Sequence, residues 1–262
     1  MDRPKDADVL WGMIAKKFGV GLPREVFTPG HSSPFAFVAD CFFHPGDDVA
    51  VWACRNGLKT LSASILAALE ARFIPGLQVR VLSGSEDQAR NLYRYWQRWC
   101  GGFLKPHLDG PVRAEVTCLK GGGRLEILAA SHKRVRGPKV HRLYEDELDE
   151  IDPEIDEAAA GMLASHSDIP ACTRYMSTWH RANGPMRRLV DGSPGNGVRV
   201  HKWNVWEVIA RCPPSRHRWG AGCRECPLRE PCLAKAREYH SRPEPGPIPP
   251  RTLDGKLVEL PS

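Results

Sequence analysis

The stretch CRNGLKT at residues 54–60 contains residue types that bind phosphate. A phosphate-binding loop usually places two glycines, with four residues between them, ahead of a lysine and a serine or threonine. Here Leu58 stands where the second glycine is usual, directly before Lys59 and Thr60. In such a loop Lys59 would hold the β- and γ-phosphates of a nucleotide, and the Thr60 hydroxyl would hold Mg²⁺. The alternative is a chance Lys-Thr pair at the beginning of a helix.

A second stretch, RLYEDELDEID at residues 142–152, supplies carboxylates. Asp146 and Glu147 follow a short apolar run of strand length, and adjacent residues at a strand end point to different sides. Asp146 would therefore hold Mg²⁺ while Glu147 polarises an attacking water. An acidic run is also typical of a solvated helix N-terminus, which is our interpretation of Asp149, Glu150, Asp152 and Glu154.

The spacing of the two stretches favours a single site. Asp146 lies 87 residues after Lys59, which leaves room for two or three strands between them. This suits folds in which the carboxylate-bearing strand is not the immediate neighbour of the strand before the loop. The next expected strand, TRYMST at 173–178, ends in Ser177 and Thr178, small polar residues able to sense a γ-phosphate.

The apolar patterns along the chain predict strands that alternate with helices. Helices are expected over 7–18, 34–43, 61–73, 86–99 and 151–165, and strands over 49–54, 77–83, 139–147, 173–178 and 198–206. Residues 111–119 and 124–131, separated by GGG, are typical of a hairpin or antiparallel edge. This order predicts an α/β fold with a mostly parallel central sheet covered by helices on both faces. It also places the Lys-Thr pair between a strand and a helix, as a phosphate loop requires.

Composition excludes several classes of protein. Hydrophobic residues make up 42% of the 262 residues, which is enough for a sizeable core and argues against global disorder. No run approaches the roughly 20 apolar residues of a membrane span. The first residues, MDRPKDADVL, lack the apolar stretch of a signal peptide. We therefore expect a soluble, cytoplasmic protein without a membrane partner. The net charge of +6 permits a polyanionic partner without demonstrating one.

Four of the nine cysteines form a cluster with the spacing C-x10-C-x2-C-x5-C. Four thiolates so close together can close a tetrahedral Zn²⁺ site, and a [4Fe–4S] cluster also takes four cysteines. The third possibility is a loop that binds no metal. A metal here would be structural, since the surrounding segment is too poor in hydrophobes to fold alone. The cluster consists of Cys212, Cys223, Cys226 and Cys232.

Several stretches together resemble a known family. They are HSSPFAFVADCFF, RNGLKT, VLSGSEDQARNLYRYWQ, AASHKRVRGPKVHRLYEDELDEID, MSTWHRANGPMRRLVD and CRECPLREPC. In this order they resemble the ATPase domain of large terminase subunits, the DNA-packaging motors of tailed bacteriophages, over most of residues 25–240. The resemblance implies a P-loop NTPase fold of the RecA/helicase-like type that uses ATP and Mg²⁺. The family's loop commonly begins with arginine and tolerates substitutions among its glycines, so CRNGLKT is similar to a variant of that loop.

The resemblance also implies roles for loop and strand-end residues. Arg55 would be a catalytic arginine acting within its own subunit and sensing the γ-phosphate. Asn56, Gly57 and Leu58 would complete the nucleotide-binding loop, with Leu58 as the departure from the usual small residue. Ser177 and Thr178 match the motif that couples hydrolysis to motion.

Further roles come from the same resemblance. Gln88 and the SGS turn at 83–85 match a second helicase-like motif, and the segment around Phe35 and Phe37 matches the region that contacts adenine. Within the basic stretch 132–139, Arg134 or Arg136 would be a catalytic finger inserted into a neighbouring subunit or would contact DNA phosphate. A solvated basic loop is the alternative for these two arginines.

The predicted organisation has four parts. Residues 1–45 form a helical lead-in with the adenine-side segment, 46–210 the ATPase core, 211–240 a small Cys-rich appendage that binds metal, and 241–262 a Pro-rich linker or tail. Nothing after residue 240 supplies the clustered carboxylates of the family's nuclease domain, so we expect the ATPase half alone, either excised or part of a split protein.

The leading functional prediction is ATP hydrolysis that drives double-stranded DNA into a procapsid. The partners implied are a homo-oligomeric ring on a portal, a small terminase subunit and a nuclease domain or chain. One alternative is a helicase-like DNA translocase. The other is a non-catalytic, metal-stapled DNA-binding module with a relic nucleotide fold, which Leu58 keeps open.

Overall fold

The computed structural model describes residues 2–128, 139–178, 181–193 and 195–208, together with two short strands at 252–253 and 256–257. Its centre is a seven-stranded sheet in the order β3-β4-β2-β5-β6-β1-β7. Every neighbouring pair is parallel except β3 and β4. The strands are β1 Val49–Ala53, β2 Gln78–Ser83, β3 Val116–Cys118, β4 Arg124–Ile127, β5 Arg142–Asp146, β6 Cys172–Thr178 and β7 Arg199–Trp203.

The strand order confirms the fold predicted from the alternation of elements. β6 lies between β1, which precedes the loop, and β5, which carries the carboxylates. The expected carboxylate strand is therefore not the neighbour of the loop strand. β3 and β4 form the expected antiparallel pair, and β4 in turn joins the parallel part of the sheet beside β2.

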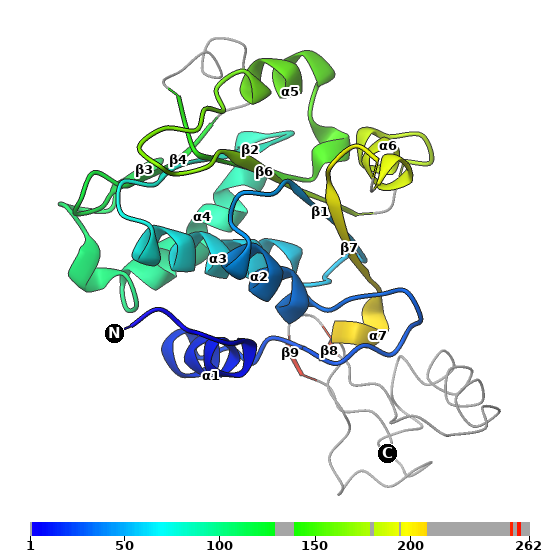
Figure 1. The fold of residues 1–262 in the computed structure, drawn as a ribbon, viewed down its shortest axis with the longest axis horizontal. Helices are drawn as coiled ribbons and strands as arrows, with labels where there is room; N and C mark the ends of the chain where they lie inside the picture. The colour runs from blue at the N-terminus through cyan, green and yellow to red at the C-terminus, as the bar shows by residue number, and fades with distance from the viewer. Residues whose placement is uncertain are drawn as a thin grey trace, which may run out of the picture.

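Helices cover both faces of the sheet (Figure 1). On one face lie α2 Pro34–Phe43, α3 Lys59–Phe73 and α4 Glu86–Cys100, with α1 Ala7–Phe18 packed outside α2. On the other face lie α5 Pro153–Ala160 and α6 Pro185–Gly192. Short helical turns complete the order: η1 Lys105–His107, η2 Leu148–Glu150 and α7 Val205–Val208. In the described part of the chain, no helix is both long and apolar enough to cross a membrane.

The central strands are buried on both sides. In β1, Val49 and Val51 belong to the core shared with α1–α4, whereas Ala50 and Trp52 belong to the core shared with α5 and α6. Successive strand residues point to opposite faces, so a strand covered on both faces must be apolar throughout. This explains why VAVWA is a continuous apolar run rather than an alternating one.

Local signals fix the helix starts next to the site. Ser33 caps α2 by accepting a hydrogen bond from the Ala36 N–H, and Pro34 occupies the first position of the helix, which spans the predicted residues 34–43. The strand expected over 198–206 ends earlier, at Trp203, because Asn204 accepts from the Trp206 N–H and begins α7. The segment 241–262, predicted to be a Pro-rich linker or tail, includes the antiparallel pair β8 Thr252–Leu253 and β9 Lys256–Leu257.

Candidate active site

The loop between β1 and α3 has the curled backbone of an anion cradle. Asn56 and Leu58 both adopt positive φ, 58° and 63°, and the Gly57 N–H closes a turn on the Cys54 carbonyl at 3.0 Å. Left-handed residues in such an alternation turn successive N–H groups toward one concavity. Position 57 admits only glycine, because a Cβ there would lie 2.7 Å from the Cys54 carbonyl oxygen. Leu58 thus adopts the left-handed conformation that a second glycine usually provides in such a loop, although leucine carries a side chain.

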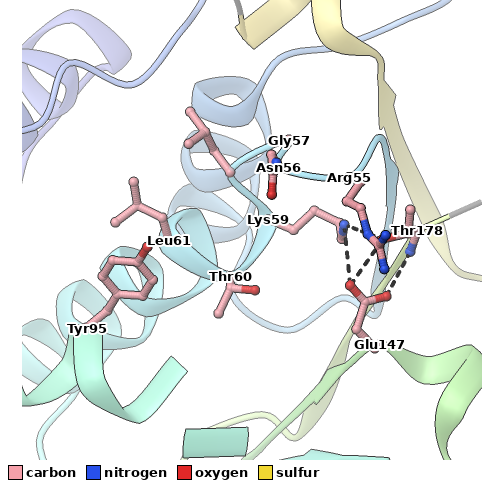
Figure 2. A pocket seen from close by; sticks show the side chains of 10 residues that line it. Arg55, Asn56, Gly57, Lys59, Thr60, Leu61, Tyr95, Glu147 and Thr178 are labelled. Carbon is pink, nitrogen blue, oxygen red and sulfur yellow. Dashed lines mark hydrogen bonds and ion pairs between the residues drawn. The ribbon is translucent and has the colours of Figure 1, made fainter. Parts of the chain in front are cut away.

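Lys59, Glu147 and Thr178 meet in front of this loop (Figure 2). The Lys59 ammonium donates to the Thr178 hydroxyl at 2.8 Å and lies 3.7 Å from the Glu147 carboxylate. Thr178 donates to Glu147 through both its backbone N–H and its hydroxyl, each at 3.1 Å. Glu147 itself has a φ of 57°, a strained conformation that occurs where the chain leaves β5. Thr178 therefore contacts both the Lys59 ammonium and the Glu147 carboxylate.

Thr60 and Asp146 form the second pair. The Thr60 hydroxyl donates to Asp146 Oδ2 at 2.8 Å, while Asp146 Oδ1 is buried and makes no hydrogen bond with the described residues. Burial raises the pKa of Asp146 to about 6, against the opposing effect of the Thr60 hydrogen bond. Mg²⁺ prefers oxygen ligands of this kind, and a buried carboxylate oxygen without a partner fits a cation site. The pair thus fits the predicted Mg²⁺.

Lys59, Thr60, Glu147 and Thr178 line one pocket with a volume of about 590 Å³, whereas Asp146 is not among its lining residues. This is within the usual range for a small-molecule site. The two lining residues that sequence reasoning did not identify are Leu61, which follows the Lys-Thr pair, and Tyr95 on α4. The lining consists of Arg55, Asn56, Gly57, Leu58, Lys59, Thr60, Leu61, Tyr95, Glu147 and Thr178.

Other predicted residues lie outside the pocket lining. Ser177 is buried, and its hydroxyl donates to the Thr178 carbonyl at 3.3 Å. Gln88 forms a capping box with Ser85 at the start of α4. Phe35 and Phe37 are buried in the core and do not line the pocket. Contact between their segment and adenine stays a prediction.

Some predictions fall outside the described residues. These include the two basic-loop arginines and the cysteine cluster, so the predicted finger and the metal-binding appendage stay predictions. Among the described residues, no group of three or more metal-ligating side chains is found. The residues concerned are Arg134, Arg136, Cys212, Cys223, Cys226 and Cys232.

Glu145 precedes Asp146 in the chain, occupies the opposite face of β5 and is fully buried. Burial, and then the charge of Asp156 on α5, raise the pKa of Glu145 well above its usual value. The folded protein therefore keeps this proton to a higher pH than the unfolded chain, whose glutamate titrates near 4.5. It follows that this residue lowers stability as the pH rises above that value.

Replacing Glu145 with glutamine removes the loss of stability that its ionisation causes as the pH rises. We expect Glu145→Gln to raise the free energy of unfolding by about 1–3 kcal/mol at pH 8. The gain shrinks toward pH 5, where the wild-type side chain is protonated in the folded protein. Urea denaturation from pH 5 to 8, beside the exposed control Glu157→Gln, measures the effect. A gain independent of pH would contradict the buried-acid explanation.

The sheet order, the curled loop and the pocket define a P-loop NTPase fold, and comparison with solved structures agrees. The large terminase of bacteriophage HK97 superposes with a TM-score of 0.53 at 14% identity, covering 80% of this chain and 46% of that one. This likeness confirms the predicted fold.

Two further solved structures are similar at lower scores. The large terminase of the thermophilic bacteriophage D6E in complex with ADP gives a TM-score of 0.46 at 12% identity, over 60% of this chain and 40% of that one. The large terminase ATPase domain of Thermus phage P74-26 gives a TM-score of 0.46 at 15% sequence identity, over 60% of this chain and 76% of that one. The chain spans less than half the length of the HK97 and D6E proteins. No protein-family model and no curated protein sequence matches it.

Proposed function

We propose that this chain is an ATP hydrolase. One observation carries the proposal: side chains from α3, from the residue after β5 and from the end of β6 line a single pocket beside a curled loop, and one of them is hydrogen-bonded to the aspartate that ends β5. These are a lysine, a threonine paired with an aspartate, and a glutamate held by a second threonine. Hydrolysis of a nucleoside triphosphate needs four of these groups: a lysine for the phosphates, a hydroxyl and a carboxylate for Mg²⁺, and a second carboxylate for the attacking water.

Each group has a role that its geometry supports. The N–H groups at the start of α3 have no acceptor within the helix and, with Lys59, would bind the β- and γ-phosphates. Thr60 and Asp146 would hold Mg²⁺, which neutralises phosphate charge when bound. Arg55, exposed at the rim of the pocket, would meet the charge that develops on the transferred phosphate.

Glu147 is the group that would activate the attacking water. Its carboxylate faces the pocket and already accepts two hydrogen bonds from Thr178, so its orientation is fixed before any substrate arrives. Departure of Lys59 from this pair toward a γ-phosphate would leave the carboxylate free to accept a proton from water. Thr178 contacts both Lys59 and Glu147, so the departure of Lys59 would change the hydrogen bonds at the end of β6.

We further propose that hydrolysis drives movement of double-stranded DNA, as in viral genome packaging. Support comes from the net charge of +6 and from the fold shared with a bacteriophage large terminase. In that role the chain would work as a homo-oligomeric ring on a portal, with a small terminase subunit and a nuclease domain or chain. Arg136 or Arg134 would then act across the subunit boundary.

The test is Mg²⁺-dependent ATP hydrolysis over a range of protein concentrations, with Lys59→Ala beside the wild type. We expect the substitution to remove hydrolysis and to weaken ATP binding at least 10-fold, because a buried cation facing the phosphates is lost. Lys120→Ala, at an exposed lysine that donates to the Pro106 carbonyl, is the matched control. Equal hydrolysis by wild type and Lys59→Ala would contradict the proposal.

A further inference from the structure

Trp203, the last residue of β7, lies against the phosphate loop although 146 residues separate it from Gly57. β7 pairs with β1 in parallel, which sets Trp203 opposite Ala53 and lets its carbonyl accept the Cys54 N–H at 3.2 Å. The side chain is buried and packs near the Phe37 ring. The indole is therefore fixed in place where the loop begins.

The indole N–H donates to the Gly57 carbonyl oxygen at 2.7 Å. In a planar trans peptide the carbonyl and the following N–H point in opposite directions. Holding the Gly57 carbonyl on Trp203 thus directs the Leu58 N–H away from the indole. That other side of the loop is the pocket, which Gly57 and Leu58 line and Trp203 does not.

The backbone preference of Leu58 by itself would favour the opposite orientation of the Gly57–Leu58 peptide. Rotating the Gly57–Leu58 peptide by half a turn would carry Leu58 from its φ of 63° to the negative φ that residues with a side chain prefer. The same rotation would turn the Gly57 carbonyl, an acceptor, toward the place of the phosphates. Gly57 offers little resistance, because it lacks a Cβ. Some other contact must hold the peptide.

The end of β7 is itself anchored, so the indole has a fixed base. Glu207 on α7 is fully buried and accepts hydrogen bonds from the Asn204 N–H and the Thr28 N–H, each at 2.9 Å. The residue after Trp203 is thereby tied to the segment that precedes α2. Movement of the indole would break these contacts as well.

We infer that Trp203 is a positioning residue of the phosphate loop: its indole N–H holds the Gly57 carbonyl outward so that the Leu58 N–H is presented to a phosphate oxygen. The inference rests on the proposed function, since it concerns the same site. It also explains how a leucine is accommodated where the loop usually has a glycine.

The first measurement is the affinity for inorganic tripolyphosphate, which contacts the loop without a base or ribose, by isothermal titration calorimetry. We expect Trp203→Phe to raise the dissociation constant about 10-fold, through loss of one oriented donor. The matched control is Trp99→Phe. Trp99 is buried in the same core, and its indole donates to the Ser64 hydroxyl at 3.1 Å, away from the loop. The control should bind like the wild type.

A double-mutant cycle separates orientation of the peptide from packing. In a Leu58→Gly background, peptide rotation relieves no strain, so Trp203→Phe should weaken binding less than in the wild-type background. Equal effects in both backgrounds, or an equal loss in Trp99→Phe, would overturn the inference. Where Trp203→Phe does not fold, Trp203→benzothienylalanine keeps the indole shape and lacks the N–H.

The outcomes also distinguish this inference from the proposed function. Tripolyphosphate binding and ATP hydrolysis by the wild type, with no change in Trp203→Phe, would overturn the positioning role and leave the ATPase standing. Absence of polyphosphate binding by a wild type that hydrolyses ATP would also overturn the positioning role alone, whereas absence of both polyphosphate binding and ATP hydrolysis would overturn both.

Discussion

Replacing Glu147 with glutamine is expected to lower the rate of ATP hydrolysis by about 10³-fold while ATP binding is retained. The amide oxygen of glutamine can still accept a hydrogen bond from the Thr178 N–H, so the side chain keeps its place. It cannot take up a proton, so activation of the attacking water is lost. Removal of a negative charge that faces the phosphates should leave affinity unchanged or make it tighter.

Hydrolysis at saturating ATP and the dissociation constant of a fluorescent ATP analogue, measured on the same sample, separate these two effects. Glu157→Gln, at an exposed position of α5, makes the same chemical change outside the pocket lining and should behave as wild type. Loss of binding together with hydrolysis would assign Glu147 a structural role. An unchanged rate would remove it from the mechanism.

The elements that position the site are largely encoded in short stretches, and these could be predicted. Lys59 and Thr60 begin a helix after the short loop that follows a buried strand, and Asp146 ends another strand, so the residues that meet at the carboxyl ends of the strands follow from the local pattern. The capping box of Ser85 and Gln88 is likewise a local signal. The parallel sheet follows from alternating strands and helices.

Contacts between distant residues could not be predicted in this way. Nothing in KWNVW indicates that the Trp203 indole reaches the Gly57 carbonyl, because the strand order that brings β7 beside β1 depends on the packing of the whole sheet. Tyr95 reaches the pocket only because α4 packs against α3. The positive φ of Leu58 is set by the loop's surroundings against the preference of the residue.

The clearest contact between residues distant in the sequence is a buried ion network, which lies toward the ends of β5 and β6 opposite to the pocket. Glu70 on α3 is buried and accepts hydrogen bonds from Arg142 Nε on β5 at 2.9 Å and from Arg174 Nη2 on β6 at 3.2 Å. The Tyr144 hydroxyl donates to its other oxygen at 2.6 Å. Burial opposes ionisation, but the two guanidinium groups outweigh it and hold the pKa of Glu70 below its usual value.

This network joins the three elements that carry the site. α3 begins with Lys59 and Thr60, β5 ends at Asp146, and β6 ends at Thr178. Glu70 connects the last turns of α3 to the opposite ends of those two strands. A substitution here should therefore lower stability and also loosen the spacing between the loop and the carboxylates.

We expect Glu70→Ala to lower the free energy of unfolding by about 3–5 kcal/mol, because two buried arginines lose their counter-charge. That is a large part of the roughly 5–15 kcal/mol that stabilises a typical domain. Since the pKa of Glu70 is lowered, its contribution is complete above 4.5, the usual pKa, and is lost as the pH falls through the lower, folded-state value. The difference between wild type and variant should therefore shrink on acidification.

Urea denaturation at pH 7 and at a series of pH values falling below 4.5 measures both parts of this prediction, with Glu157→Ala as a control at an exposed helix position. A loss below 1 kcal/mol at pH 7 would mean that the arginines find other partners, such as the Pro45 and Pro170 carbonyls, which already accept from them. A full loss that persists at low pH would assign the effect to a cavity instead of to charge. Only a loss that is large at pH 7 and shrinks as the pH falls below 4.5 supports an ionised Glu70 as the link between α3 and the two strands.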